Sequence, residues 1–554
     1  MSSGGPPKAA SADERDACIP DTVKNFVFDL HDACRRSQSA VEARNLYVVE
    51  YRSLCEKYFS NCAWPSSSGI SSECNADPIF LALYGELTTR HYHGTCRTTV
   101  ADRIDSWSTY RHLFDTLLNL ANDPGADTMG GLYVPAEWAF AAVNEFVYQF
   151  QAFCQFRTNV VGRKEHEMKV LRENRDAWAV ETVMFYLHGL VRIAGLDGEE
   201  DAPAATQGHR VFGTYAAVGL SRLECLLGDY TSCLAALKPL RHVMHSIIHP
   251  PPLPLENSTG GPPVTPKTAF ADPLHGIVPA RATVAYHAGV SYLLLRRYRD
   301  AARIMSPMAA FLLRGLKNGT LRRLVGSEQL PKLNERMVTL LAILTHICPG
   351  CTPCVAEEVR TQIRDRHGET LAKIDAGDEG YEDLFAHACP KFVCPAVPNY
   401  DRAPGGAAGA SQDASKSAYN LQVRQFISEV TNHGPLRKLR SYLRLYTSIR
   451  ADKMAAFNDL SVSNLAELLC GYKLKMFQLE RKDDADTISP PTLDVVSALE
   501  GSVRSALDVT YFVDKDMIHV EEDSKKMRFD EYFLKQIGAC NEVLEDIQTI
   551  PITI

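Results

Sequence analysis

The chain has 554 residues and a mass of 61.4 kDa; 45% of the residues are hydrophobic, 23% are charged, and the formal net charge is −8. This composition is ordinary for a soluble globular protein. The length excludes an architecture with one hydrophobic core, so we expect two or three structural units.

The N-terminus and the cysteines bear on the cellular compartment. Residues 1–18 are predicted to be a disordered tail, because residues 1–12 are rich in Ser, Gly, Pro and Ala and lack the pattern of a signal segment. The longest uncharged run, residues 337–356, is interrupted by Pro and Gly, which favours a buried helix over a membrane span. The 16 cysteines follow no small-scaffold pattern and are expected to be reduced. We therefore predict a cytoplasmic protein, with the nucleus as the alternative.

The N-terminal region, residues 19–130, is predicted to be helical. Apolar residues recur there at helical spacing over residues 21–34, 46–59, 78–87 and 107–120. A longer helix over residues 135–157 carries an aromatic stripe made of Trp138, Val143, Phe146, Phe150 and Phe153. We interpret this stripe as core and not as the lining of a ligand pocket, because a helix of a globular protein turns its apolar stripe inward.

Two later segments resemble each other. Leu226-Leu-Gly-Asp-Tyr230 and Leu294-Leu-Arg-Arg-Tyr298 lie 68 residues apart, about twice the roughly 34-residue period of tetratricopeptide repeats. Each predicts a helix, a tight turn and a second helix. Residues 131–330 are therefore predicted to be TPR-like helical repeats that stack as an α-solenoid, with a proline-rich insertion at residues 249–266.

The next predicted domain covers residues 331–520. Its helical part comprises residues 333–348, 355–367 and 421–430, and a Gly/Ala/Ser-rich insertion at residues 402–417 is expected to be flexible. Residues 436–446, 451–457 and 462–472 then predict three helices, followed by β-prone runs at residues 509–512 and 517–520. This order predicts a winged helix over residues 436–520, with a second flexible insertion at residues 481–493. The fold class is therefore mostly all-α: an α-solenoid capped by a winged helix.

A winged helix can bind nucleic acid, so the charges on its helices matter. The helix at residues 462–472 contains Glu467 and no Lys or Arg, which argues against sequence-specific DNA binding. The first helix is basic, and its outer faces carry four candidate RNA-contacting residues: Arg437, Lys438, Arg440 and Arg444. The alternative is a solvated face that pairs with acidic neighbours.

The sequence carries no recognisable catalytic motif. It has no Walker loop, no His-Glu-x-x-His, no Gly-x-Ser-x-Gly and no dinucleotide fingerprint, so we predict no catalytic residue, no cofactor and no small-molecule substrate. Cys348, Cys351 and Cys354 have the spacing of a metal knuckle, with His346 before them. The second half of a zinc site is missing, and the intervening Pro and Gly also suit a turn between helices. We therefore predict no metal.

The C-terminal segment, residues 521–554, is predicted to contain a helix with one apolar seam. Its members are spaced by 4, 3, 4 and 3 residues, as in a heptad repeat: Phe533, Ile537, Cys540, Leu544 and Ile547. Two heptads are marginal in water without packing, and an exposed seam invites aggregation. We expect helices of partner proteins to cover this seam; the alternative is packing on the chain's own solenoid.

A solenoid followed by a winged helix is the element order of the PCI domain, which the chain therefore resembles. Several motifs point to one family within this class. In addition to the two repeat motifs, they are Glu145-Phe-Val-Tyr-Gln-Phe-Gln-Ala-Phe153, Asn334-Glu-Arg-Met337, Cys389-Pro-Lys-Phe-Val-Cys-Pro-Ala-Val-Pro-Asn-Tyr-Asp401 and Tyr511-Phe-Val-Asp-Lys-Asp-Met-Ile-His519. From about residue 135 to residue 544 the chain resembles the L-subunit family of eukaryotic translation initiation factor 3. The first part of the chain matches less clearly.

This resemblance implies a non-catalytic scaffold subunit that assembles with other PCI subunits on the small ribosomal subunit and supports initiation and mRNA recruitment. It implies the K and E subunits as neighbours and a C-terminal helix within a multi-subunit bundle. The chain departs from the family pattern at residues 249–266, 402–417 and 481–493. Two alternatives remain: a PCI subunit of a proteasome lid, signalosome or mRNA-export assembly, and a free winged-helix nucleic-acid-binding protein.

Overall fold

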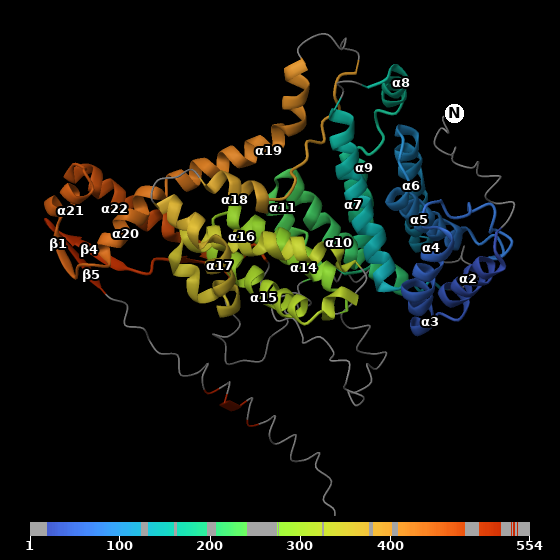
Figure 1. The fold of residues 1–554 in the computed structure, drawn as a ribbon, viewed down its shortest axis with the longest axis horizontal. Coiled ribbons are helices and arrows are strands. Elements are labelled where there is room, and N and C mark those ends of the chain that lie inside the picture. Colours follow the sequence, from blue (N-terminus) through green and yellow to red (C-terminus); the bar gives the residue numbers. More distant parts are fainter. Residues whose placement is uncertain are drawn as a thin grey trace, which may run out of the picture. The chain divides into compact units, whose positions relative to one another are not determined.

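The structure is a computed structural model of the chain (Figure 1). It describes residues 19–122, 131–159, 163–196, 206–240, 274, 276–323, 326–375, 380–400, 408–481, 498–521, 533, 536, 537 and 540. The chain divides into two compact units: unit 1 is Met1–His433 with Met476–Ala506, and unit 2 is Gly434–Lys475 with Leu507–Ile554. The predicted N-terminal tail and the proline-rich insertion at residues 249–266 lie outside the described residues.

Unit 1 begins with the helical region that the sequence predicts. Its elements are α2 (Asp21–His31), η1 (Asp32–Arg36), α3 (Ala40–Asn45), η2 (Leu46–Glu50), α4 (Tyr51–Tyr58), α5 (Pro78–Thr95) and α6 (Val100–Asn122). Helix α5 starts after Asp77 because this carboxylate accepts a hydrogen bond from the Ile79 amide at 3.0 Å, and Pro78 occupies the first position of the helix. The same carboxylate accepts from Arg35 Nε at 2.7 Å, which joins α5 to η1.

The aromatic stripe of α7 (Ala136–Thr158) is core, as predicted. Trp138, Phe146 and Phe150 are fully buried. The Phe146 ring centroid lies 6.3 Å from that of Trp107 and 5.3 Å from that of Trp178, so the stripe connects α6 to the segment before α9. Helices α8 (Glu165–Glu173), α9 (Val180–Ile193) and α10 (Gln207–Leu227) follow, and α10 packs against both α7 and α9 (Figure 1).

The two similar motifs both form a helix, a turn and a helix. Gly228, with φ 89°, joins α10 to α11 (Tyr230–Ala235), and Arg296, with φ 61°, joins α14 (Val278–Leu294) to α15 (Tyr298–Lys317). The left-handed residue occupies the same place in each motif, where glycine is unstrained and arginine is not. Helix α10 packs on α14, α14 on α15, and α15 on α16 (Leu330–Ile347). This succession confirms the predicted α-solenoid.

The rest of the helical part contains one correction. Its remaining elements are η4 (Lys238–Leu240), η5 (Thr320–Arg323), η6 (Ser327–Gln329), η7 (Pro349–Cys354), α17 (Glu357–Asp375), α18 (Tyr381–Ala388) and α19 (Ala408–Thr431). Residues 402–417 are predicted from their composition to be flexible, but α19 begins at Ala408, so this prediction is wrong from there onward. Alanine is the strongest helix former, and the segment continues directly into the amphipathic run at residues 421–430.

A second correction concerns residues 436–520, which are predicted to form a winged helix interrupted only by the insertion at residues 481–493. Within this range a two-stranded antiparallel ribbon, β2 (Phe477–Glu480) and β3 (Ser502–Ser505), belongs to unit 1. The ribbon buries its polar side: Glu480 is 1% exposed, whereas Val503 on the other side is 70% exposed. The Glu480 carboxylate pairs with Arg299 at 3.1 Å and with Arg303 at 2.7 Å. The ribbon is therefore attached to α15 by ion pairs.

Arg297 strengthens this attachment. Its guanidinium pairs with Asp300 at 2.6 Å and donates to three carbonyl groups on the segment before β3, those of Ala498, Leu499 and Glu500. The sequence gives little sign of the ribbon, because four-residue strands carry almost no periodicity. The arginine that Glu480 contacts, Arg299, lies 181 residues earlier.

Replacing Glu480 with glutamine should detach the ribbon locally. The change replaces the carboxylate that pairs with the half-buried guanidinium groups of Arg299 and Arg303 by a neutral amide, at a cost of about 2 kcal/mol. Amide hydrogen exchange at residues 477–480 and 502–505 should then accelerate about 30-fold, while exchange in α7 stays unchanged. Glu500→Gln is the matched control, because its exposed carboxylate makes no described ion pair. Equal exchange in both variants would show that the ion pairs do not hold the ribbon.

Unit 2 has the element order of a winged helix. Its elements are α20 (Gly434–Leu443), β1 (Ser448–Arg450), α21 (Ala451–Phe457), α22 (Val462–Met476, the last residue belonging to unit 1), β4 (Thr510–Asp514) and β5 (Met517–Glu521). The sheet is antiparallel in the order β1-β5-β4, with Ile518 opposite both Ile449 and Val513. The apolar stripe predicted for the first helix is buried at Leu436, Leu439 and Leu443.

A buried histidine in unit 1 should make stability fall in acid. His287 of α14 is 8% exposed, and burial is the main reason that its pKa is lowered to about 3. The unfolded chain therefore binds a proton below about pH 6.5 while the folded chain does not, so stability is lost as pH falls. Between about pH 8 and pH 5 the loss from this group should be about 2 kcal/mol.

Urea unfolding at both pH values checks this expectation. The His287→Gln variant should lose less stability in acid than the unchanged chain, whereas His188→Gln, at an exposed position of α9, should behave like the unchanged chain. The same loss in all three proteins would mean that other groups cause the acid sensitivity.

Candidate partner and RNA surfaces

The C-terminal seam is described at three of its five predicted positions. Phe533, Ile537 and Cys540 are helical, and Phe533 and Ile537 are 58% and 55% exposed. Leu544 and Ile547 lie outside the described residues. Phe533 and Ile537 therefore expose large apolar side chains four residues apart, and their coverage by a partner stays a prediction.

The four basic residues predicted to contact RNA lie in different environments. Arg440 faces Asp508 with Nε 3.0 and 3.1 Å from its two carboxylate oxygens and a further Nη2 contact, so its guanidinium is engaged within unit 2. Arg437 is half-buried, and Lys438 and Arg444 are exposed. Arg440 therefore already uses two of its donor nitrogens in a bidentate ion pair, and RNA contact by the four residues stays a prediction.

Helix α22 occupies the place of a recognition helix. Leu465, Leu469 and Tyr472 are buried, so one side of the helix faces the core of unit 2. Its exposed side includes Glu467 and Leu474, the latter 65% exposed. The only basic residues of the helix, Lys473 and Lys475, lie in its last turn. This arrangement does not suit base reading in a DNA groove.

The cysteine turn of unit 1 brings two of its three thiols together. Cys348 and Cys351 are fully buried with their Sγ atoms 3.3 Å apart, and Cys354 is partly exposed. His346, predicted as a neighbour, instead contacts the Tyr381 hydroxyl at 2.6 Å and Asp375 at 3.1 Å. In the part of the chain that the structure describes, no group of three or more His, Cys, Asp or Glu residues could hold a metal ion.

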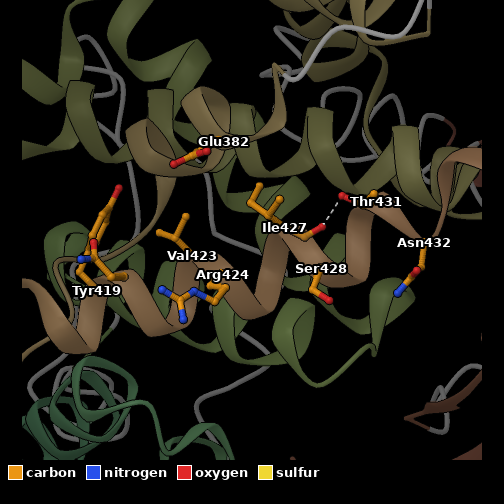
Figure 2. A pocket seen from close by; sticks show the side chains of 9 residues that line it. Glu382, Tyr419, Val423, Arg424, Ile427, Ser428, Thr431 and Asn432 are labelled. Carbon is orange, nitrogen blue, oxygen red and sulfur yellow. Dashed lines mark hydrogen bonds between the residues drawn. The ribbon is translucent and has the colours of Figure 1, made fainter.

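A groove that the sequence gives no sign of runs along α19 (Figure 2). Its volume is about 600 Å³, and Glu382 of α18 lies across it from Tyr419 and Val423 of α19. The Thr431 hydroxyl donates to the Ile427 carbonyl at 2.8 Å and not to a base. Among the described lining residues, no nucleophile is paired with a base, so the groove offers a mixed polar and apolar surface without catalytic geometry.

The long motif at residues 389–400 is an extended segment bound across three helices. The Val393 amide donates to the Leu226 carbonyl of α10 at 2.9 Å. Side chains of α7 and α8 donate to three of its carbonyl groups: Gln151 to Lys391 at 3.0 Å, Arg172 to Tyr400 at 3.2 Å, and Arg157 to Pro395. The unusual length of this motif therefore has a structural reason, because each carbonyl meets a donor from a different turn of helix.

Sequence reasoning missed the aromatic residues beside the basic helix. Tyr442, Tyr446 and Phe457 lie together on the surface of unit 2 with Lys453 over two of the rings. The sequence signal that could have found them is a lysine four residues before an aromatic residue in each of two successive helices. This spacing places the lysine and the aromatic residue on the same face of their helix.

The fold and these surfaces define a class of protein: a helical-repeat chain with a winged helix and an exposed apolar seam. A profile of the family described as "RNA polymerase I-associated factor PAF67" matches residues 102–540. In the described part of the chain, no helix is both long enough and apolar enough for a membrane span.

Relatives named "Eukaryotic translation initiation factor 3 subunit L" are similar along nearly the whole chain. The relative from Nematostella vectensis is 30% identical over 547 residues, which cover 96% of this chain and 94% of the relative. Those from Xenopus laevis and Homo sapiens are 30% and 29% identical over 561 residues, covering 95% of this chain and 90% of each relative. The chain therefore belongs to the family of eukaryotic translation initiation factor 3 subunit L, which confirms the resemblance of its motifs.

Proposed function

We propose that the chain is a non-catalytic scaffold subunit of translation initiation factor 3, working in the cytoplasm. The observation that carries this proposal is the similarity to subunit L over 96% of the chain, which includes the solenoid and the winged helix. The fold supports a scaffold role, because stacked helices present long surfaces to several partners at once. The seam of the C-terminal helix supplies one such surface at Phe533 and Ile537.

The neighbours in the assembly are the K and E subunits, and the whole assembly sits on the small ribosomal subunit. Unit 2 offers a second contact of the kind used between PCI domains. Strand β4 lies at the edge of its sheet, with Phe512 and Val513 47% and 52% exposed. An edge strand with apolar side chains can pair with a strand of a partner. RNA contact by Arg437, Lys438 and Arg440 on α20, and by Arg444 just after its end, is part of the same proposal.

Affinity purification of the tagged chain from cells of its source tests the proposal. Mass spectrometry should identify the K and E subunits, and the RNA fraction should contain the RNA of the small ribosomal subunit. Recovery of proteasome-lid, signalosome or mRNA-export subunits would assign the chain to another assembly. Recovery of nucleic acid without initiation-factor subunits would make it a free winged-helix protein.

A further inference from the structure

Three aromatic rings stack on the surface of unit 2. The ring centroids of Tyr442 and Phe457 are 5.6 Å apart with an interplanar angle of 22°, and those of Tyr446 and Phe457 are 6.3 Å apart at 24°. Phe457 is therefore the middle ring, and the Tyr442 hydroxyl donates to its carbonyl at 3.3 Å, which fixes α21 against α20. Phe457 is 36% exposed and both tyrosines are half-buried, so the stack borders solvent.

Two lysines share helical faces with rings of this stack. Lys438 precedes Tyr442 by four residues on α20, and Lys453 precedes Phe457 by four residues on α21, so each lysine shares a helical face with one ring. Lys453 Nζ lies 6.0 Å from the centroid of Tyr446 and 5.8 Å from that of Phe457.

The charge of these cations is not neutralised nearby. Lys438, Arg444 and Lys453 are exposed, and none of them forms an ion pair with a described carboxylate. Asp452, the acidic residue beside Lys453 in the sequence, pairs with Arg450 at 2.9 Å.

Stacked aromatic rings bordered by free cations are the chemistry of single-stranded nucleic-acid binding, where bases stack on rings and phosphates meet lysine and arginine. A duplex groove does not fit, because the only basic residues of α22 lie in its last turn. A protein partner would need carboxylates opposite three cations and would gain only a small apolar contact. We infer that this surface binds single-stranded RNA, with bases on the Tyr442–Phe457–Tyr446 stack and phosphates at Lys438, Arg444 and Lys453. The inference rests on the proposed function, which brings the chain to RNA.

Fluorescence anisotropy of the full chain with a labelled oligouridine tests the inference, since oligouridine is single-stranded and unstructured. The unchanged chain should bind it with an affinity that falls as salt rises. Phe457→Ala removes the middle ring, against which both tyrosines pack, and should weaken binding about 5- to 100-fold, the range for loss of one stacking ring. Lys438→Gln with Lys453→Gln, at exposed positions that cannot disturb the core, should reduce the slope of log affinity against log salt by roughly 1.4, about 0.7 for each cation.

Leu474→Ala with Lys515→Gln is the matched control, because it removes an exposed apolar side chain and an exposed lysine from other parts of the same unit. Its affinity and salt slope should equal those of the unchanged chain. Absence of saturable binding, or equal weakening in the control, would overturn the inference. Loss of initiation-factor subunits from the lysine variant with RNA affinity intact would also overturn it, by showing a protein-binding surface. None of these results bears on the co-purification of the unchanged chain, which tests the proposed function separately.

Discussion

An Ile537→Asp, Leu544→Asp double variant should fail to assemble with initiation-factor subunits, while the isolated chain keeps its helical content and melting temperature. Ile537 is helical and 55% exposed, so it contributes little to the core of the free chain. Full burial of such a side chain at an interface is worth roughly 1.5–3 kcal/mol, and two of them therefore about 3–6 kcal/mol of association. This corresponds to a loss of affinity of about two to four orders of magnitude.

Co-purification yield measures the association, and circular dichroism measures the fold. Gln536→Asp with Asn541→Asp is the matched control, because it adds the same charge beside the seam, and Gln536 is exposed on the same helix. Normal assembly of the seam variant, or unfolding of the isolated variant, would mean that the tail packs on its own chain.

Asp77→Ala should destabilise unit 1 by about 3–5 kcal/mol, the range for removing one partner of a buried ion pair. Arg35 and Asp77 have side chains only 1% and 5% exposed, and His31 Nε2 lies 3.3 Å from the same carboxylate. Without Asp77 the Arg35 guanidinium stays buried and loses its carboxylate at 2.7 Å, although it keeps the Gly131 carbonyl as an acceptor. Urea denaturation followed by circular dichroism gives the free energy of unfolding.

Asp229→Ala is the control that distinguishes the loss of the buried ion pair from the loss of a helix cap. Asp229 also caps a helix, with its carboxylate 2.9 Å from the Ser232 amide, but it makes this contact at the surface. Loss of such a cap costs about 1 kcal/mol. If Asp77→Ala costs no more than Asp229→Ala, then capping explains the whole effect and the Arg35 ion pair adds nothing.

Local patterns in the sequence predict most of the helices and the turns between them. The 3-4-3 spacing that begins at Leu436 predicts α20, and the burial of Leu439 and Leu443 confirms its inward face. The two repeat motifs predict both helical hairpins, because Gly228 and Arg296 follow the same pair of leucines. Each of these signals comes from neighbours within about two turns of the chain.

What the sequence does not predict depends on residues far apart in the chain. From the sequence, Arg440 is predicted to lie on an outer face of its helix, where it could contact a phosphate. The sequence does not show that Asp508, 68 residues later, is its ion-pair partner. The ribbon is not predicted from the sequence for the same reason, because the ion-pair partners of the Glu480 carboxylate lie on α15. The aromatic stack likewise combines Tyr442 and Phe457 from two helices, so the sequence does not predict it. The sequence does show a lysine four residues before each of these two aromatic residues.

The interleaving of the two units along the chain has a consequence for the order in which the protein matures during synthesis. Strand β1 ends at Arg450, but its only described strand partner is β5, which ends at Glu521. Helices α20 to α22 therefore leave the ribosome long before their sheet can close, and the ribbon that completes unit 1 emerges in the interval. Because domains generally fold as units during synthesis, unit 1 should be complete only after Ala506 and the sheet of unit 2 only after Glu521 has been synthesised. A nascent chain interrupted before β5 would expose the inner faces of three helices, and chaperones and proteases would recognise it as unfinished.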